Sequence, residues 1–199
     1  MFGLAVMVAF GLYLLLSYIV VRMAAGYARR HGRSTARWGW GAAVVMYLLV
    51  FWDWIPTIVA HRYYCATEAG IWVYKTFYQW QKENPEIEET LTTNKVLEPV
   101  HEGDNDNWTN IYTLNQRISQ KGKHSGPLFL HVWEYKSELI DVKTNETLLR
   151  LVDFSTSQER RGGGWHGWKF WLSVSHCDGY IKRAIQFGET ERHFIGNDR

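Results

Sequence analysis

The sequence predicts an α+β protein. A transmembrane helical hairpin over residues 1–60 is followed by an exported domain over residues 61–199, which has a mainly antiparallel β-sheet and one short helix. Three observations support this prediction. Two long apolar runs lie near the N-terminus, an arginine-rich segment separates them, and β-prone runs alternate with turn residues in the rest of the chain.

The first apolar run, Phe2–Val21, contains no charged residue. A helix of this length measures about 30 Å, which matches the hydrocarbon core of a bilayer. A cleaved signal peptide is the alternative, but signal peptides carry their positive charge before the apolar run. Here Arg22 and further arginines follow the run, which favours a retained membrane anchor.

The second apolar run, Trp38–Ala60, contains one charged residue, Asp53. A buried helix of a soluble protein is the alternative, but two such runs close together favour two membrane spans. An ionisable side chain inside a span is a functional candidate. Because Asp53 lies near the outer end and Pro56 follows within one turn, we expect an interfacial carboxylate that reaches water or faces the start of the first span.

The segment between the two runs, residues 22–37, predicts the orientation in the membrane. It contains five arginines and no acidic residue. Short loops rich in Arg and Lys stay in the cytoplasm. Both termini are therefore expected outside the cytoplasm, in the periplasm of a bacterium or the lumen of a eukaryotic compartment.

The predicted exported domain is close to neutral. Residues 61–199 carry 17 Lys and Arg residues and 19 Asp and Glu residues, so the net charge is near −2. The basic balance of the whole chain therefore comes from the segment 22–37. No basic stripe is visible in the domain, which argues against nucleic-acid binding.

The order of elements in the domain follows from residue type. Runs rich in β-branched and aromatic residues predict strands over 70–77, 128–142, 147–155, 168–177 and 180–187. The turn Lys143-Thr144-Asn145-Glu146 separates the second and third of these runs and predicts a β-hairpin. A short helix is expected over 79–91, interrupted near Pro85, and the polar segment 94–110 is expected to be an exposed loop.

Cys65 and Cys177 are the two cysteines of the chain. Both fall on the exported side, where an oxidising compartment favours a disulfide between them; a pair of buried free thiols is the alternative. Neighbouring residues on a strand point to opposite faces, so His176-Cys177-Asp178 is not expected to act as a nucleophile with its base. No H-x-x-x-H or C-x-x-C spacing occurs, so neither a metal site nor a cofactor is predicted.

The segment 160–171 is the main candidate for contact with a ligand or partner. Its three consecutive glycines give a loop with accessible backbone amides, but it lacks the G-K-[ST] ending of a phosphate loop. The candidate contact residues are Trp165, His166, Trp168 and Trp171, which are suited to a glycan, a lipid headgroup or a protein. The alternative is a hairpin connection whose tryptophans pack into the core or rest on the membrane.

Two stretches of the chain carry a family resemblance. The first combines Trp52-Asp53-Trp54-Ile55-Pro56 with the run 64–76, and the second lies within 138–154. Both resemble segments of small two-pass bacterial inner-membrane proteins with a C-terminal periplasmic domain. The resemblance implies a location in the bacterial inner membrane, and it assigns no catalytic residue.

Three classes of function are open at this point. The lack of a catalytic motif and the many aromatic side chains, which are enriched at protein interfaces, favour a non-enzymatic accessory or partner-binding subunit of an envelope complex. Its expected partners are the lipid bilayer and a protein of the membrane or periplasm. The alternative is a membrane-tethered ligand-binding or sensing module for a glycan or lipid. An enzyme is least supported, because general acid–base catalysis needs carboxylates or histidines positioned in a pocket.

Overall fold

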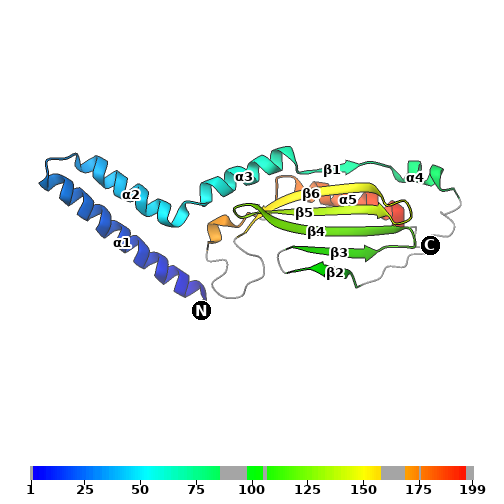
Figure 1. Cartoon of the computed structure of the whole chain (residues 1–199), viewed down its shortest axis with the longest axis horizontal. Coiled ribbons are helices and arrows are strands. Elements are labelled where there is room, and N and C mark those ends of the chain that lie inside the picture. The colour runs from blue at the N-terminus through cyan, green and yellow to red at the C-terminus, as the bar shows by residue number, and fades with distance from the viewer. Residues whose placement is uncertain (1, 86–97, 105–106, 158–168, 175, 196–199) are drawn as a thin grey trace.

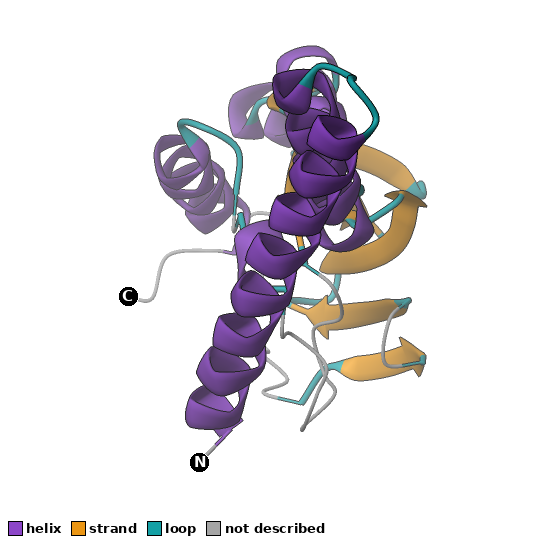
Figure 2. Ribbon diagram, turned by 90° about the vertical axis from the view of Figure 1, so that its left-hand side faces the viewer, coloured by secondary structure: helices purple, strands orange, loops and turns teal. Residues whose placement is uncertain are grey.

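The computed structural model describes residues 2–85, 98–104, 107–157, 169–174 and 176–195. Its fold is α+β: three helices precede a six-stranded antiparallel sheet that is flanked by further helices. Figure 1 shows the first two helices as a hairpin at one end of the molecule, the sheet at the other end, and the third helix between them. In Figure 2 the strands lie on the right and the helices on the left and in the centre.

Helices α1 (Phe2–Arg30) and α2 (Thr35–Phe51) run antiparallel and pack against each other (Figure 1). The rings of Phe10 and Phe51 meet edge-on with centroids 6.1 Å apart, and the Tyr13 hydroxyl donates a hydrogen bond to the carbonyl oxygen of Met46. Helix α1 is long and apolar enough to cross a membrane. Its composition is therefore compatible with a membrane location.

The second apolar run is not one continuous helix. Helix α2 ends at Phe51, and helix α3 (Trp54–Thr67) starts after a break and is bent from it by 56°. The predicted second span over 38–60 is therefore divided between two helices, and only the bent pair together is long and apolar enough to cross. Pro56 explains the break, because its missing N–H is tolerated in the first turn of a helix but not in the interior.

The arginine-rich segment is also mostly helical. Helix α1 continues through Arg30 and α2 begins at Thr35, so residues 31–34 alone connect the two helices instead of the expected 22–37. Alanine and arginine, which are abundant in this segment, are both good helix formers. The positive charges consequently lie on the two helix ends that flank a tight turn.

The sheet has the strand order β1-β6-β5-β4-β3-β2, and every neighbouring pair is antiparallel. Its strands are β1 (Gly70–Val73), β2 (Val100–Gly103), β3 (Trp108–Thr113), β4 (Ile118–Phe129), β5 (Val132–Asp141) and β6 (Glu146–Thr156). The predicted hairpin around 143–146 is confirmed as β5 and β6, and the predicted strand at 70–77 is confirmed as the shorter β1. Strand β1 has a single neighbour, β6, and therefore forms one edge of the sheet.

Three of the strands were not predicted. The expected loop over 94–110 contains β2 and the start of β3, and β4 was missed altogether. Strand β4 buries Ile118, Gly122 and His124 on alternate positions. Glycine and histidine are not typical strand residues. The alternation of buried and exposed residues along β4 therefore cannot be recognised from the sequence alone.

The last two predicted strands were wrong. The region predicted as a strand over 168–177 contains the single 3₁₀ turn η2 (Phe170–Leu172), although Val174 forms an isolated bridge to Thr156; residues 168 and 175 lie outside the described part. Helix α5 (Tyr180–Ile195) replaces the strand expected over 180–187. It buries Phe187 and Phe194, two full turns apart, which is the helical period.

The main core lies between one face of the sheet and the helices α4 (Phe77–Glu83) and α5. It is formed by Trp80, Leu114, Ile118, Leu139, Leu148, Leu149, Leu151, Phe187 and Phe194. Helix α4 confirms the start of the helix predicted over 79–91, while residues 86–97 lie outside the described part. A smaller core joins α3 to the hairpin of β5 and β6, where Tyr64 stacks on Phe154 at 5.2 Å.

Candidate functional site

Two clusters of polar side chains lie where the N-terminal helices meet the sheet. We call Asp53, His131 and Lys169 the junction cluster, and His61, Cys65, Asp153, His176, Cys177 and Arg183 the disulfide cluster. Each cluster combines residues from helix α3 or its start with residues more than 70 positions further along the chain. Both therefore depend on the tertiary fold.

The junction cluster is centred on Asp53, which is fully buried between α2 and α3. Its Oδ2 accepts hydrogen bonds from His131 Nε2 at 3.0 Å and from Lys169 Nζ at 2.5 Å. Its Oδ1 has no hydrogen-bond partner within the described ranges, and neither has the buried hydroxyl of Thr57, one turn later. The expectation that Asp53 reaches water or the start of α1 was therefore wrong: its carboxylate is buried and bonded to Lys169 and His131 of the domain.

The junction also contains an aromatic contact. The rings of Phe51, at the end of α2, and Trp171, in η2, lie 4.6 Å apart. Trp171 was predicted as a ligand or partner contact, and the structure places it against Phe51 of α2 and in the wall of a cavity. The other three residues predicted for that contact, Trp165, His166 and Trp168, lie outside the described residues.

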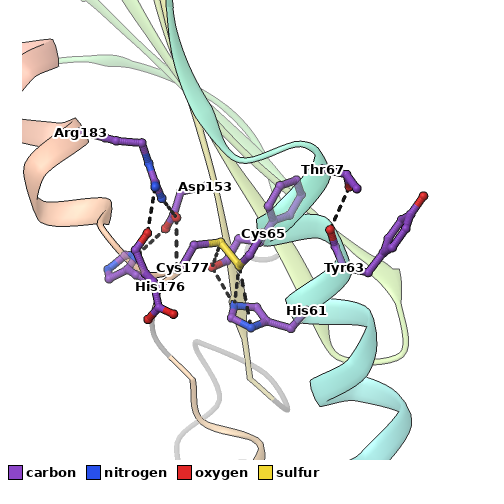
Figure 3. The surroundings of a disulfide bond; sticks show 10 residues. His61, Tyr63, Cys65, Thr67, Asp153, His176, Cys177 and Arg183 are labelled. Atoms are coloured by element: carbon purple, nitrogen blue, oxygen red, sulfur yellow. Dashed lines mark hydrogen bonds and ion pairs between the residues drawn. A yellow bond between two sulfur atoms is a disulfide. The ribbon is translucent and has the colours of Figure 1, made fainter.

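The disulfide cluster contains the predicted bond between Cys65 and Cys177, whose Cα atoms are 5.5 Å apart. Cys65 lies in the last turn of α3, and Cys177 lies three residues before α5. The bond closes a loop of 112 residues in sequence separation. Figure 3 shows it bridging the helix and the segment that leads into α5.

His61 lies one turn before Cys65 and faces the disulfide (Figure 3). Its Nε2 lies 3.1 Å from the carbonyl oxygen of Phe154. A carbonyl oxygen only accepts hydrogen bonds, so Nε2 carries the hydrogen and Nδ1 of the neutral ring keeps a free lone pair. The two ring nitrogens lie 3.4 Å (Nε2) and 3.9 Å (Nδ1) from Cys65 Sγ, and the side chain is 5% exposed.

Asp153, on strand β6, holds the segment that carries Cys177. Its Oδ2 accepts from His176 Nδ1 at 2.7 Å, and its Oδ1 accepts from the backbone N–H of Cys177 at 3.2 Å and from Arg183 at 3.4 Å. The His176 ring stacks on Tyr180 at 3.9 Å. Since His176 pairs with Asp153 and Cys177 is oxidised, the run His176-Cys177-Asp178 forms no nucleophile–base pair, in line with the sequence analysis.

The disulfide lines a cavity of about 610 Å³. Helix α3 contributes Trp54, Ile58, His61 and Cys65 to its wall, and the segment before α5 contributes Cys177 and its neighbours. A second cavity of about 610 Å³ reaches Cys177 from the first turns of α5. Polar and aromatic side chains thus line the cavities on either side of Cys177.

The cluster could hold a metal ion only in a reduced form. The donor atoms of His61, Cys65 and Cys177 lie within 4.8 Å of one another. While the sulfur atoms are bonded to each other they offer no thiolate, which is the form that binds metals.

Sequence reasoning missed most partners in both clusters. His61 and Cys65 are four residues apart on a predicted helix, which places them on one face, and this spacing could have linked His61 to the disulfide. No local signal joins Asp53 to His131 and Lys169, or Asp153 to His176, because each pair is made by strands and turns distant in sequence.

Comparisons with known proteins add no relationship to this geometry. No protein-family model, curated protein or solved structure matches the chain. The resemblance to small two-pass inner-membrane proteins stays a prediction, and any function has to be argued from the residues of the chain.

Proposed function

We propose that this chain is a non-enzymatic, membrane-anchored subunit that binds a partner protein where its helices leave the membrane. In this proposal α1 and the bent pair of α2 and α3 cross a bacterial inner membrane, residues 31–34 and the flanking arginines face the cytoplasm, and the domain lies in the periplasm. The antiparallel pairing of α1 and α2 and the clustering of arginines at their connected ends support this topology.

The observation that carries the proposal is the exposed apolar face of α3. Ile55, Val59 and Tyr63 are each between 58% and 63% exposed, and they lie four residues apart on one side of the helix. Trp52, which is 55% exposed, precedes the helix and lies three residues before Ile55. The opposite side of α3, which contains Thr57 and His61, is buried against the domain. Large apolar side chains that share an exposed face mark an interaction surface. We call Trp52, Ile55, Val59 and Tyr63 the α3 stripe.

The attachment of α3 supports the same function. A domain that only needs tethering can follow a flexible linker, but α3 is held by the disulfide at its end and by the paired carboxylate of Asp53 at its start. This double attachment fixes the direction of the domain relative to α2. A fixed direction is useful when the surface has to fit a partner that is itself held in the membrane.

Site-specific photo-crosslinking in native membranes tests the proposal. A photoreactive phenylalanine analogue replaces Val59 or Tyr63 of the α3 stripe, and Tyr78 on α4, which is 74% exposed, serves as the control. We expect Val59 and Tyr63 to crosslink to one and the same protein and Tyr78 not to. Crosslinks to lipid alone from both stripe positions would overturn the proposal and leave α3 as a membrane-surface helix.

A ligand-binding module is the second candidate, and the cavity beside the disulfide favours it. Drug-sized ligands bind in cavities of about 300–1,000 Å³ lined by apolar and aromatic side chains, and this cavity of about 610 Å³ has Trp54 and Trp171 in its wall. Saturable quenching of tryptophan fluorescence by lipid or glycan fragments, reduced in Trp54→Phe, would support it. Absence of quenching by both classes would remove it.

A further inference from the structure

We propose that Cys65–Cys177 is an exchangeable disulfide, which a dithiol in the same compartment reduces at the cavity beside α3. The proposal is independent of the partner-binding function. It rests on the unequal exposure of the two cysteines, on His61 beside Cys65, and on the cavity that both cysteines line.

The two cysteines differ in exposure. Cys177 is 5% exposed, whereas Cys65 is half-buried and lies at the cavity wall. Thiol–disulfide exchange requires a thiolate to reach one sulfur, and its rate depends on that access. The incoming sulfur therefore meets Cys65, and Cys177 is the sulfur that leaves.

His61 supplies the proton transfer that the exchange needs. Its Nε2–H is held by the Phe154 carbonyl, so Nδ1, 3.9 Å from Cys65 Sγ, is the nitrogen that can accept a proton. The thiolate is the reactive form, and a base within hydrogen-bond reach generates it from a thiol. His61 is buried and oriented by a backbone contact, which is how a base is kept in position.

The exchange balances with a dithiol as the two-electron reductant. The first thiol gives its proton to His61 and its sulfur bonds to Cys65 Sγ; the Cys65–Cys177 bond breaks, and its electron pair and that proton pass to Cys177. The second thiol then attacks the first sulfur, Cys65 leaves with the second proton, and the partner departs as a disulfide.

The surroundings of Cys177 can accommodate its reduced thiol after the disulfide is cleaved. Cys177 Sγ lies 3.7 Å from the carbonyl oxygen of Phe154, which can accept a weak hydrogen bond from the reduced S–H. Its backbone N–H is bonded to Asp153, whose carboxylate is also paired with His176 and Arg183. These bonds do not involve the sulfur, so they hold the segment in place after the disulfide opens.

The first test measures reduction of the folded protein. Full-length protein in detergent micelles is treated with dithiothreitol without denaturant, and opened thiols are counted by a maleimide mass tag on a gel. We expect reduction at a rate proportional to the dithiothreitol concentration. A disulfide that opens only after unfolding in urea would overturn the proposal.

The second test separates His61 from a general effect on the fold. His61→Gln keeps an amide that can donate to the Phe154 carbonyl but has no basic nitrogen, and His193→Gln on the exposed side of α5 is the matched control. We expect His61→Gln to slow reduction about tenfold at an unchanged melting temperature, because the variant has no basic nitrogen to take the proton of the incoming thiol. Equal rates in both variants would remove His61 from the exchange.

The third test identifies the source of the dithiol. Cys177→Ser leaves Cys65 able to keep a mixed disulfide, and Cys65→Ser is the control with the buried sulfur alone. In native membranes, a reductant-sensitive protein adduct on Cys177→Ser indicates a protein dithiol, and a glutathione adduct indicates the small-thiol pool. If Cys65 of the Cys177→Ser variant stays a free thiol in native membranes and also after incubation with glutathione disulfide, the proposal is contradicted.

Discussion

The two ends of the domain each bury an aspartate beside a cation, but they complete the pairing differently. At the end remote from α1 and α2, both oxygens of Asp141 are used: Arg117 bonds to each of them, Trp80 Nε1 donates to Oδ2, and the Lys143 backbone donates to Oδ1. At the junction, Asp53 uses one oxygen for His131 and Lys169 and leaves the other without a partner in the described part of the chain.

This difference indicates that the Asp141 network stabilises the fold and that the junction cluster around Asp53 allows the position of the domain to change. A fully bonded buried network rigidifies the elements that it joins, whereas an unsatisfied buried group costs stability and calls for a functional explanation. The Asp141 network adjoins the main core through Trp80. The junction cluster lies at a helix break, where Asp53 is next in sequence to Trp54, which lines the cavity beside α3. We therefore expect the first end to determine folding stability and the second end to determine how the domain is positioned.

The largest effect is expected for Asp141→Asn. The substitution leaves the buried Arg117 guanidinium without its carboxylate, and breaking such a pair from one side costs about 3–5 kcal/mol. Urea unfolding of the detergent-solubilised protein measures the loss. A cost below about 1 kcal/mol, the range of exposed pairs, would contradict the structural role of this network.

Removal of the disulfide comes next. The double variant Cys65→Ala with Cys177→Ala is expected to lose about 2–4 kcal/mol, because a cross-link across a long loop restricts the unfolded chain. Hydrogen exchange should rise in α3 and in the first turn of α5 while the β4–β5 pairing keeps its protection. An equal rise in hydrogen exchange across the whole sheet would contradict a local effect of the disulfide on α3 and α5.

Asp53→Asn is expected to cost less than Asp141→Asn, about 1.5–3 kcal/mol, the range for hydrogen bonds to charged groups. Lys169 and His131 have side chains that are 14% and 23% exposed and can turn toward water when the charge is removed. Unfolding in urea gives the energy, and the distance between spin labels on α2 and β5 gives the positioning. A cost as large as that of Asp141→Asn would contradict the claim that the junction cluster contributes less to stability than the Asp141 network.

The stability that Asp141 provides depends on pH. Burial raises the pKa of Asp141, but the hydrogen bonds from Arg117 and Trp80 outweigh it, so the pKa lies below its ordinary value of 3.8. The stability from this ionised group is complete above that ordinary value and is lost as the pH falls from there through the lower folded pKa. Asp141→Asn should therefore flatten the acid limb of the stability curve below about pH 4.

The smallest effect is expected on the charged face of the sheet. Arg150 Nε and Glu138 Oε1 are 2.7 Å apart, but the Arg150 side chain is 34% exposed. Glu138→Gln should change stability by no more than about 1 kcal/mol. Parallel urea titrations of this variant and the Asp141→Asn protein would show whether burial, and not the count of ion pairs, sets the cost.

The sequence predicted the parts of the fold that local chemistry determines. Apolar length predicted α1, the turn at 143–146 predicted the β5–β6 hairpin, and the cysteine pair predicted the disulfide. It failed for β4, where Gly122 and His124 occupy inward positions only because neighbouring strands accept them. It failed for α5 because the eight residues 180–187 are too few to distinguish the helical from the strand period.

The candidate site was less predictable than the fold. Asp53 was recognised as an unusual acid, but its partners come from the β4–β5 turn and from the segment before η2. Only tertiary structure brings such residues together. Trp171 was predicted as a contact because it is an aromatic residue near the glycine-rich segment, and no signal in the sequence indicated its neighbour Phe51.

Affinity purification of the full-length protein from native membranes in mild detergent, followed by mass spectrometry, tests partner binding most directly. It should be run beside Val59→Glu in the α3 stripe and Tyr78→Glu on α4, both at exposed positions. We predict one stoichiometric partner with the unmodified protein and with Tyr78→Glu, and its loss with Val59→Glu. A solitary protein, or a partner retained equally by all three, would contradict binding at the α3 stripe.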